Sequence, residues 1–293
     1  MWLVRHICAC GYGTSRELLI ACPNMEEFQF KTLISAGFLF LGLSTLAASS
    51  LAFRGSKNTV GNVTRKNMVP WSPSGFLGTG ERSPVYGIMW GIIYTLAAGC
   101  IVGLIIAALG RAPVHEPERL MWASFSCFCC FLFSSLWELF YTRETPTGFV
   151  LASVILCLCA VVSGISSFLI NPFADVRDSW AEDLCGVCFA FLFGWVLVAT
   201  ALSIGITTRV FNRGINANTI EEDETSWWPL ALGILSIILS CVFFNGVIAL
   251  PLLTASFFFR GFLKTWRVWI ASVLAAVAAG VGVCLMLLDR YTF

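Results

Sequence analysis

Charged residues are scarce in this chain of 293 residues. Asp, Glu, Lys and Arg together make up 12% of the sequence, whereas they make up about a quarter of a typical soluble domain. Hydrophobic residues account for 58%, and the formal net charge is +1 at pH 7. This balance indicates hydrophobic side chains that face lipid, and it offers no positive field for nucleic acid. We therefore expect the lipid bilayer to be a partner of the protein, and we expect no nucleic acid.

Histidine is also rare. The two histidines, His6 and His115, lie in polar segments, so no apolar run contains a pair of imidazoles for haem or zinc. The last apolar run lacks lysine, which argues against a retinal Schiff base. Phosphate-binding glycine loops, serine elbows and metalloprotease motifs are likewise absent from the sequence. We expect neither a metal nor a cofactor.

Long apolar runs dominate what is present. Each run has about the 20 residues that a helix needs to cross the hydrocarbon at 1.5 Å per residue. The strands of a membrane barrel would instead appear as short alternating segments. The predicted fold class is therefore all-α: a polytopic, multi-pass integral membrane protein with about seven transmembrane helices in one bundle. The runs cover residues 34–53, 85–109, 120–141, 149–170, 184–206, 227–250 and 268–288.

The runs divide the chain into four predicted parts. Lys and Arg are shared evenly between the two sides of the predicted bundle, so the positive-inside rule gives no orientation. Two connections, residues 54–84 and 207–226, are longer than packing requires, and such loops are often lids or partner surfaces. The parts are an N-terminal tail (1–31), a five-helix bundle (32–206), an acidic loop (207–226) and two further transmembrane helices (227–293).

Thirteen cysteines are many for a chain of this kind. Most of them fall inside the apolar runs, where free cysteine packs as a small hydrophobic residue. Cys185-x-x-Cys188 has the spacing of half a zinc site, but no histidine lies near it. We therefore expect these cysteines to pack in the core and to bind no metal.

Three tryptophans, Trp90, Trp137 and Trp195, lie inside predicted spans rather than at their ends. Each has companions at helical spacing, so three aromatic faces could meet around one cavity. Ordinary core packing is the other interpretation, because aromatic stripes on helices are commonly buried against neighbours. The candidate ligand-binding residues are Trp90, Tyr94, Ser134, Trp137, Trp195, Ala199 and Ser203.

Glu138 is the only ionisable residue within a predicted span. A carboxyl in the hydrocarbon is costly and therefore suggests a function. If it were buried and protonated, it could act as a general acid beside aromatic walls, as protonation of an alkene or epoxide requires. It also lies about one turn from Arg143, so it could instead reach the interface or pair with that arginine. Both interpretations of Glu138 stay open at this point.

Short motifs on successive runs resemble the tryptophan-rich sensory protein, or translocator protein, family. Trp90-Gly-Ile-Ile-Tyr94-Thr-Leu is similar to the second-helix pattern of that family, and Ser134-Ser-Leu-Trp137 is similar to its third-helix pattern. The stretch from Trp195 through Ala199-Thr-Ala-Leu-Ser203 resembles its fifth-helix pattern, although Ser134 and Ser203 stand where the family has asparagine. Across residues 32–206 the resemblance implies five helices enclosing a pocket for a porphyrin, sterol or similar flat apolar ligand.

A second, more local resemblance concerns Trp137-Glu138 followed by Leu-Phe-Tyr. This segment is similar to the Trp-Glu motif of the small membrane terpene cyclases, in which a glutamate is the proposed acid. The resemblance implies Glu138 as the catalytic residue if the protein is an enzyme. A second acid would then be needed, and Glu182, Asp183 and Asp289 lie near span ends.

Three functions remain open on the sequence. The leading hypothesis is a receptor or carrier that binds a flat hydrophobic ligand, a porphyrin, sterol or isoprenoid, with residues 54–84 as a lid. The first alternative is a membrane-embedded cyclase or isomerase of an isoprenoid, with Glu138 as general acid. The second alternative is a structural subunit of a larger membrane complex or a homo-oligomer, held by small residues and aromatic surface.

Overall fold

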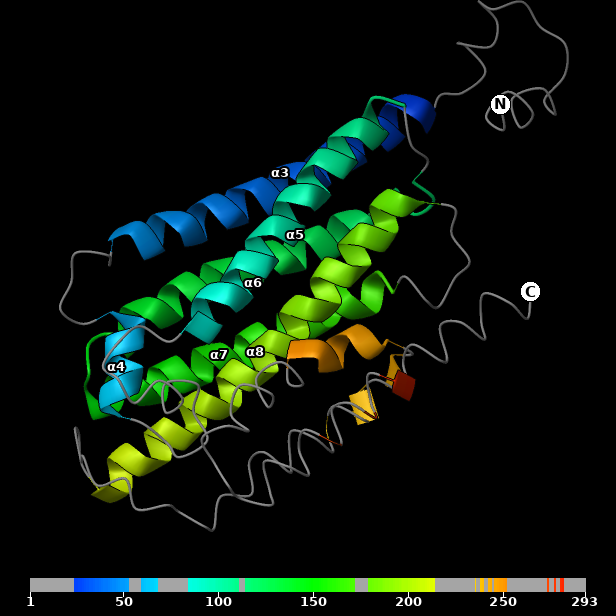
Figure 1. The fold of residues 1–293 in the computed structure, drawn as a ribbon. Coiled ribbons are helices and arrows are strands. Elements are labelled where there is room, and N and C mark those ends of the chain that lie inside the picture. Colours follow the sequence, from blue (N-terminus) through cyan, green and yellow to red (C-terminus); the bar gives the residue numbers. More distant parts are fainter. Residues whose placement is uncertain are drawn as a thin grey trace, which may run out of the picture.

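The computed structural model describes residues 24–52, 59–67, 84–110, 114–171 and 179–213, together with 235, 238–239, 242–243, 245–251, 273, 277 and 280–281. The regular elements of these residues are helical (Figure 1). They are α3 (Asn24–Ala52), α4 (Val60–Lys66), α5 (Pro84–Ala108), α6 (Pro117–Tyr141), α7 (Pro146–Leu169), α8 (Trp180–Arg213) and the short 3-10 helix η2 (Gly246–Ala249).

Five of these helices, α3, α5, α6, α7 and α8, are long and apolar enough to cross a membrane. Large hydrophobic side chains such as Phe40, Val102 and Val161 are exposed on their outer faces, as lipid-facing residues would be. The all-α prediction is confirmed for the part of the chain that the structure describes. The predicted count of seven is not, because the runs at 227–250 and 268–288 fall mostly outside the described residues.

Local sequence sets the turn between α6 and α7. Thr145 caps α7 by accepting a hydrogen bond from the Gly148 amide at 3.0 Å, and Pro146 begins the helix. Glu144 has a φ of 50°, in the left-handed region that closes a tight turn. A side chain at Gly148 would lie 2.8 Å from the Phe140 carbonyl oxygen, so glycine fits there. These residues hold α6 and α7 together as a short hairpin of helices.

Two helices extend beyond their predicted limits. α3 begins at Asn24, inside the predicted N-terminal tail, and its Lys31 pairs with Glu27 at 2.9 Å and with Glu118 of α6 at 3.7 Å. α8 continues to Arg213, into the predicted acidic loop. The charged and polar residues that mark the end of an apolar run therefore continue the helix beyond it. The acidic residues 221–224 lie outside the described residues.

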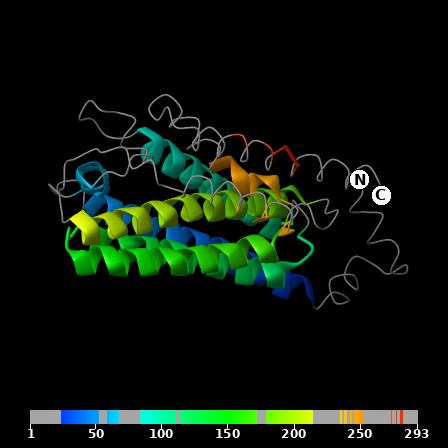
Figure 2. The same cartoon turned by 90° about the horizontal axis from the view of Figure 1, so that it is seen from below.

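The five long helices form a closed ring, in which each packs against two others: α3 against α5 and α6, α7 against α6 and α8, and α5 against α8. Contacts near the helix ends give the directions. The N-terminal parts of α3 and α6 meet through Lys31 and Glu118, whereas Gly103 near the end of α5 lies against Trp180 at the start of α8. α3, α6 and α8 therefore run one way and α5 and α7 the other, with α4 at one end of the bundle (Figures 1 and 2).

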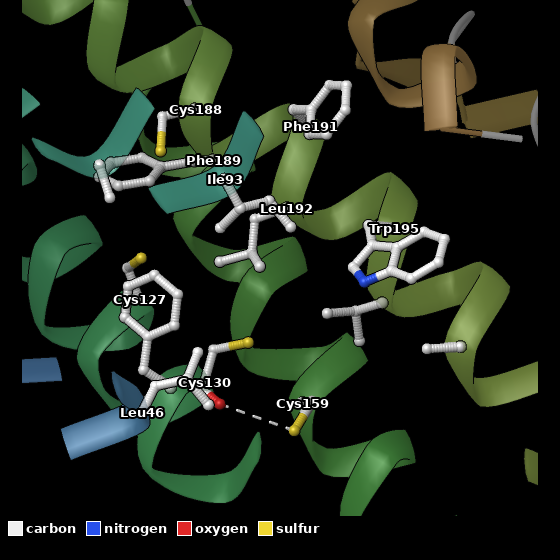
Figure 3. Close-up of a cluster of buried hydrophobic side chains, with 14 of the residues drawn as sticks. Leu46, Ile93, Cys127, Cys130, Cys159, Cys188, Phe189, Phe191, Leu192 and Trp195 are labelled. Atoms are coloured by element: carbon white, nitrogen blue, oxygen red, sulfur yellow. Dashed lines mark hydrogen bonds between the residues drawn. The ribbon is translucent and has the colours of Figure 1, made fainter. Parts of the chain in front are cut away.

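Six cysteines lie in the core of this ring, as the apolar setting of most of them predicts. Figure 3 shows Cys127, Cys130 and Cys159 among buried aliphatic and aromatic side chains, with the Cys159 thiol donating to the Cys130 carbonyl at 3.7 Å. None of the described residues forms a group of three or more potential metal ligands. The core cysteines are Cys100, Cys127, Cys130, Cys159, Cys185 and Cys188.

A short break interrupts the sixth predicted run. Asn245 is buried with an extended backbone, and its side-chain oxygen accepts from the Val247 amide at 3.0 Å, which starts η2. η2 packs on α8 at Gly194, where an added Cβ would overlap the Ile248 carbonyl oxygen. The prediction of an unbroken helix over 227–250 is therefore wrong at this point. Hydropathy does not indicate the break, because Asn245 is the one polar residue among residues 245–250.

Candidate functional site

A cavity of about 320 Å³ lies between α3, α5 and α6, at the end of the bundle that α4 covers. This volume is at the lower end of the range for small-molecule sites in proteins. Its wall is mostly apolar, with a few polar groups among the aromatic ones. The lining residues are Leu46, Ser50, Val60, Gly61, Trp90, Gly91, Tyr94, Ser134, Trp137 and Glu138.

The aromatic part of the wall comes from two helices. Trp90 and Tyr94 lie one turn apart on α5 with ring centroids 6.0 Å apart, and both are half-buried. Trp137 of α6 is 8% exposed and packs against Tyr141 with a centroid distance of 5.1 Å. The structure thus brings together Trp90, Tyr94 and Trp137, which the sequence singled out separately. The sequence could not show that α3, rather than α8, completes the wall.

The polar end of the cavity is formed by Glu138. Its Oε2 accepts a hydrogen bond from the Ser49 hydroxyl at 2.9 Å and a longer one from the Ser50 hydroxyl at 3.4 Å. The two serines lie in the last turn of α3, beside the α6 residue that they contact. Neither was among the predicted site residues. A pair of small polar residues at the end of an apolar run was the available signal.

Arg143 is not the partner of Glu138. Its guanidinium lies 5.3 Å from the centroid of the Phe140 ring. Among the residues that the structure describes, Glu138 belongs to no ion pair. The interpretation in which Glu138 simply pairs with Arg143 therefore does not describe this structure. Glu138 is half-buried and lines the cavity.

Two further residues that line the cavity carry polar groups. The indole N–H of Trp137 is buried and makes no hydrogen bond within the described part of the chain. A buried donor without a partner costs about 1–3 kcal/mol, and this nitrogen is too deeply buried to face the cavity. The Ser134 hydroxyl, by contrast, donates to the Cys130 carbonyl of its own helix at 2.8 Å. Trp137 therefore contributes its ring, and not its N–H, to the cavity wall.

The helix α4 lies in the long connection that the sequence predicts as a lid. Thr59 caps it, and Val60 and Gly61 in its first turn line the cavity. At its other end, Lys66 forms a 2.8 Å ion pair with Glu144 of the α6–α7 turn. α4 thus covers the cavity and is fastened to the bundle. Residues 53–58 and 68–83 lie outside the described residues.

The three α8 candidates lie apart from this lining. Trp195 is fully buried in the core of the ring, where Figure 3 shows it close to Leu192. Ser203 shares a 2.9 Å hydrogen bond with Ser153 of α7. Ala199 is buried and lies between Trp195 and Ser203 along α8. The hydrogen bond of Ser203 links α7 and α8. The involvement of these three candidates in binding stays a prediction, while Trp90, Tyr94, Ser134, Trp137 and Glu138 meet at one site.

The acids proposed as partners of Glu138 lie elsewhere. Glu182 is buried, and its Oε1 accepts from the backbone amides of His115 and Glu116, at 3.0 Å each, just before α6. Residues 116 and 138 are separated by the length of α6, roughly 33 Å at 1.5 Å per residue. Glu182 and its neighbour Asp183 thus belong to the opposite end of the bundle. Asp289 lies outside the described residues.

The fold and the site define a class of helical protein, in which five long apolar helices form a ring. An aromatic cavity with one carboxyl group lies at one end of that ring. No family model, curated protein or solved structure matches the chain. The function therefore has to be argued from the site itself.

Proposed function

We propose that this protein is an integral membrane receptor or carrier that binds a compact hydrophobic small molecule in the cavity between α3, α5 and α6. The observation that carries this proposal is the convergence of Trp90, Tyr94 and Trp137, from two helices, on one cavity. Aromatic walls with a few fixed polar groups are typical of small-molecule sites. The five apolar helices would place this site within the bilayer, close to one surface.

The resemblance to the tryptophan-rich sensory protein family supports the proposal. It implies five helices around a pocket for a porphyrin, sterol or similar ligand, and the motifs that carry it on α5 and α6 supply lining residues. The volume of about 320 Å³ favours an isoprenoid or one part of a sterol over a whole macrocycle. A porphyrin would require α4 to move away from the opening.

A second candidate function is a membrane-embedded isoprenoid cyclase. The observation that favours it is the position of Glu138, whose carboxyl faces the same cavity as the aromatic rings. A carboxyl that donates a proton beside such rings could start a cyclisation, because aromatic faces stabilise a cationic intermediate. This function needs a protonated Glu138 within reach of a carbon–carbon double bond or an epoxide.

Mass spectrometry of small molecules that co-purify with the protein from its host in mild detergent tests both functions. Trp90→Ala removes a wall of the cavity, and Trp122→Ala is the control, since Trp122 lies on α6 but is 53% exposed and outside the lining. We expect one compound to be retained by the wild type and by Trp122→Ala and to be lost from Trp90→Ala.

Glu138→Gln separates the two functions. A binding protein retains the same compound, in the same chemical form, or releases it unaltered. A cyclase carries a cyclised product in the wild type and accumulates the uncyclised precursor in the variant. If no compound distinguishes Trp90→Ala from the wild type, the cavity is not a ligand site and both proposals fail.

A further inference from the structure

Among the described residues, no cation pairs with the carboxyl group of Glu138. The two basic side chains described at this end of the bundle are engaged elsewhere. Lys66 pairs with Glu144 at 2.8 Å, and the Arg143 guanidinium lies over the Phe140 ring. A half-buried carboxyl group that lines a cavity and has no positive partner among the described residues is costly to ionise unless a ligand brings a cation.

The two serines hold the Glu138 carboxyl group in one orientation. Ser49 and Ser50 both hydrogen-bond to Oε2, and the Ser49 hydroxyl also lies 2.9 Å from the Leu46 carbonyl oxygen of its own helix. Both contacts are made to Oε2, and neither serine contacts Oε1. The last turn of α3 thus orients the carboxyl group at the edge of the cavity.

The aromatic wall suits a cation as well. Trp90, Tyr94 and Trp137 line the cavity together with Glu138, and aromatic faces attract ammonium groups within about 6 Å of the ring centroid. A carboxylate and aromatic faces around one cavity form a site for a positively charged nitrogen attached to an apolar body. Neither feature alone would specify a cation.

We propose that the cavity selects a hydrophobic amine, with its protonated nitrogen at Glu138 and its apolar body against Trp90, Tyr94 and Trp137. This inference rests on the proposed binding function and narrows the ligand class. A ligand that carries carboxylates, as an acidic tetrapyrrole does, would be repelled by Glu138. A neutral sterol or hydrocarbon would leave the carboxylate without a counter-ion.

Three probes that share one apolar body test the inference: phenylbutylamine, phenylbutanol and phenylbutyrate. Their dissociation constants are measured by calorimetric titration of the protein in phosphatidylcholine nanodiscs, after subtraction of binding to empty nanodiscs. We expect the amine to bind the wild type about tenfold more tightly than the alcohol, the ratio that one hydrogen bond to a charged group supplies. Phenylbutyrate should bind most weakly.

The variants identify the group responsible. Glu138→Gln keeps the shape of the side chain but removes the charge, so the preference for the amine should disappear while the alcohol binds as before. Glu138→Asp keeps the charge and should keep part of the preference. Glu118→Gln is the matched control, because Glu118 lies at the opposite end of α6 and is 69% exposed. It should behave as the wild type.

Each unexpected result has a separate meaning. Equal affinity of the wild type for amine and alcohol overturns the amine inference and leaves the binding site in place. Retention of the preference in Glu138→Gln, or its loss in Glu118→Gln, also overturns it, because the selectivity would then come from surface charge. Failure of all three probes to bind overturns the inference, and the proposed function fails too if Trp90→Ala leaves the co-purifying compounds unchanged.

Discussion

Trp137 belongs both to the buried core and to the cavity wall. Its ring packs against Tyr141 and contributes to the core, while its indole N–H is buried without a hydrogen-bond partner among the described residues. The folded protein bears the cost of that donor, which a side chain without an N–H would remove, while the ring itself lines the cavity. The same side chain should therefore matter little for the stability of the empty protein and more for binding.

Trp137→Phe tests this division of roles. The smaller ring loses some packing, but the variant also loses the unsatisfied donor, so we expect the free energy of unfolding to change by less than about 1 kcal/mol. Affinity for the ligand that co-purifies with the wild type should fall by about threefold to tenfold, because the smaller ring leaves less apolar contact in the cavity wall. Thermal unfolding with and without that ligand measures both quantities.

Trp195→Phe is the matched control for this prediction. Trp195 is fully buried in the ring core and lies outside the cavity lining. The same substitution there should lower the stability by about 2 kcal/mol and leave the ligand affinity unchanged. A large loss of stability in Trp137→Phe, with normal affinity, would show that Trp137 is purely a packing residue.

At the scale of elements, α4 is the part of the site that the rest of the protein holds in place least firmly. A helix of seven residues is too short to be stable by itself, so it depends on its contacts. Its own Val63 is fully buried, and the ion pair between Lys66 and Glu144 fastens its last turn. This arrangement is suited to a lid that opens without unfolding the ring.

Lys66→Gln should loosen this lid. A partly exposed ion pair contributes about 0–1 kcal/mol, so amide hydrogen exchange over 61–66 should rise by at most about fivefold while the melting temperature stays nearly constant. Ligand association and dissociation should both become faster. Hydrogen–deuterium exchange by mass spectrometry and stopped-flow binding measure these changes.

Arg119→Gln serves as the comparison, since it breaks the 2.8 Å pair with Glu116 at the other end of the bundle. It should leave exchange in α4 as in the wild type. The double variant Lys66→Glu with Glu144→Lys restores the pair with reversed charges and should restore slow exchange. If exchange in α4 does not respond to Lys66→Gln, the lid is held by Val63 rather than by the ion pair.

The sequence predicted the elements better than their arrangement. Apolar runs of membrane-spanning length identify helices because unpaired backbone groups are excluded from lipid. They do not identify neighbours, because each outer face is as hydrophobic as each inner face. Trp90 and Trp137 were therefore recognised as candidates, whereas their shared cavity, the Ser49 and Ser50 contacts with Glu138 and the placement of Trp195 in the core required the structure.

At the scale of the whole molecule, Gly194 lies where the C-terminal part of the chain meets the five-helix ring. It is in the middle of α8, and an added Cβ would overlap the Ile248 carbonyl oxygen of η2. Glycine alone permits this approach because it has no Cβ. Inside a helix, it lowers the stability by about 0.5–1 kcal/mol relative to alanine. The close approach of η2 thus depends on a single missing methyl group.

Gly194→Ala should therefore displace η2 from α8. Overpacking costs about 1–3 kcal/mol, which exceeds the gain in helix propensity, so the melting temperature should fall by several degrees. Hydrogen exchange over 246–250 should rise, while exchange in α6 and α7 should be unchanged. Gly37→Ala is the control: no atom lies within 4 Å of a Cβ there, so the substitution should keep or raise stability. If Gly194→Ala behaves like Gly37→Ala, η2 does not pack against α8, and the ring would then be stable without the segment that follows it.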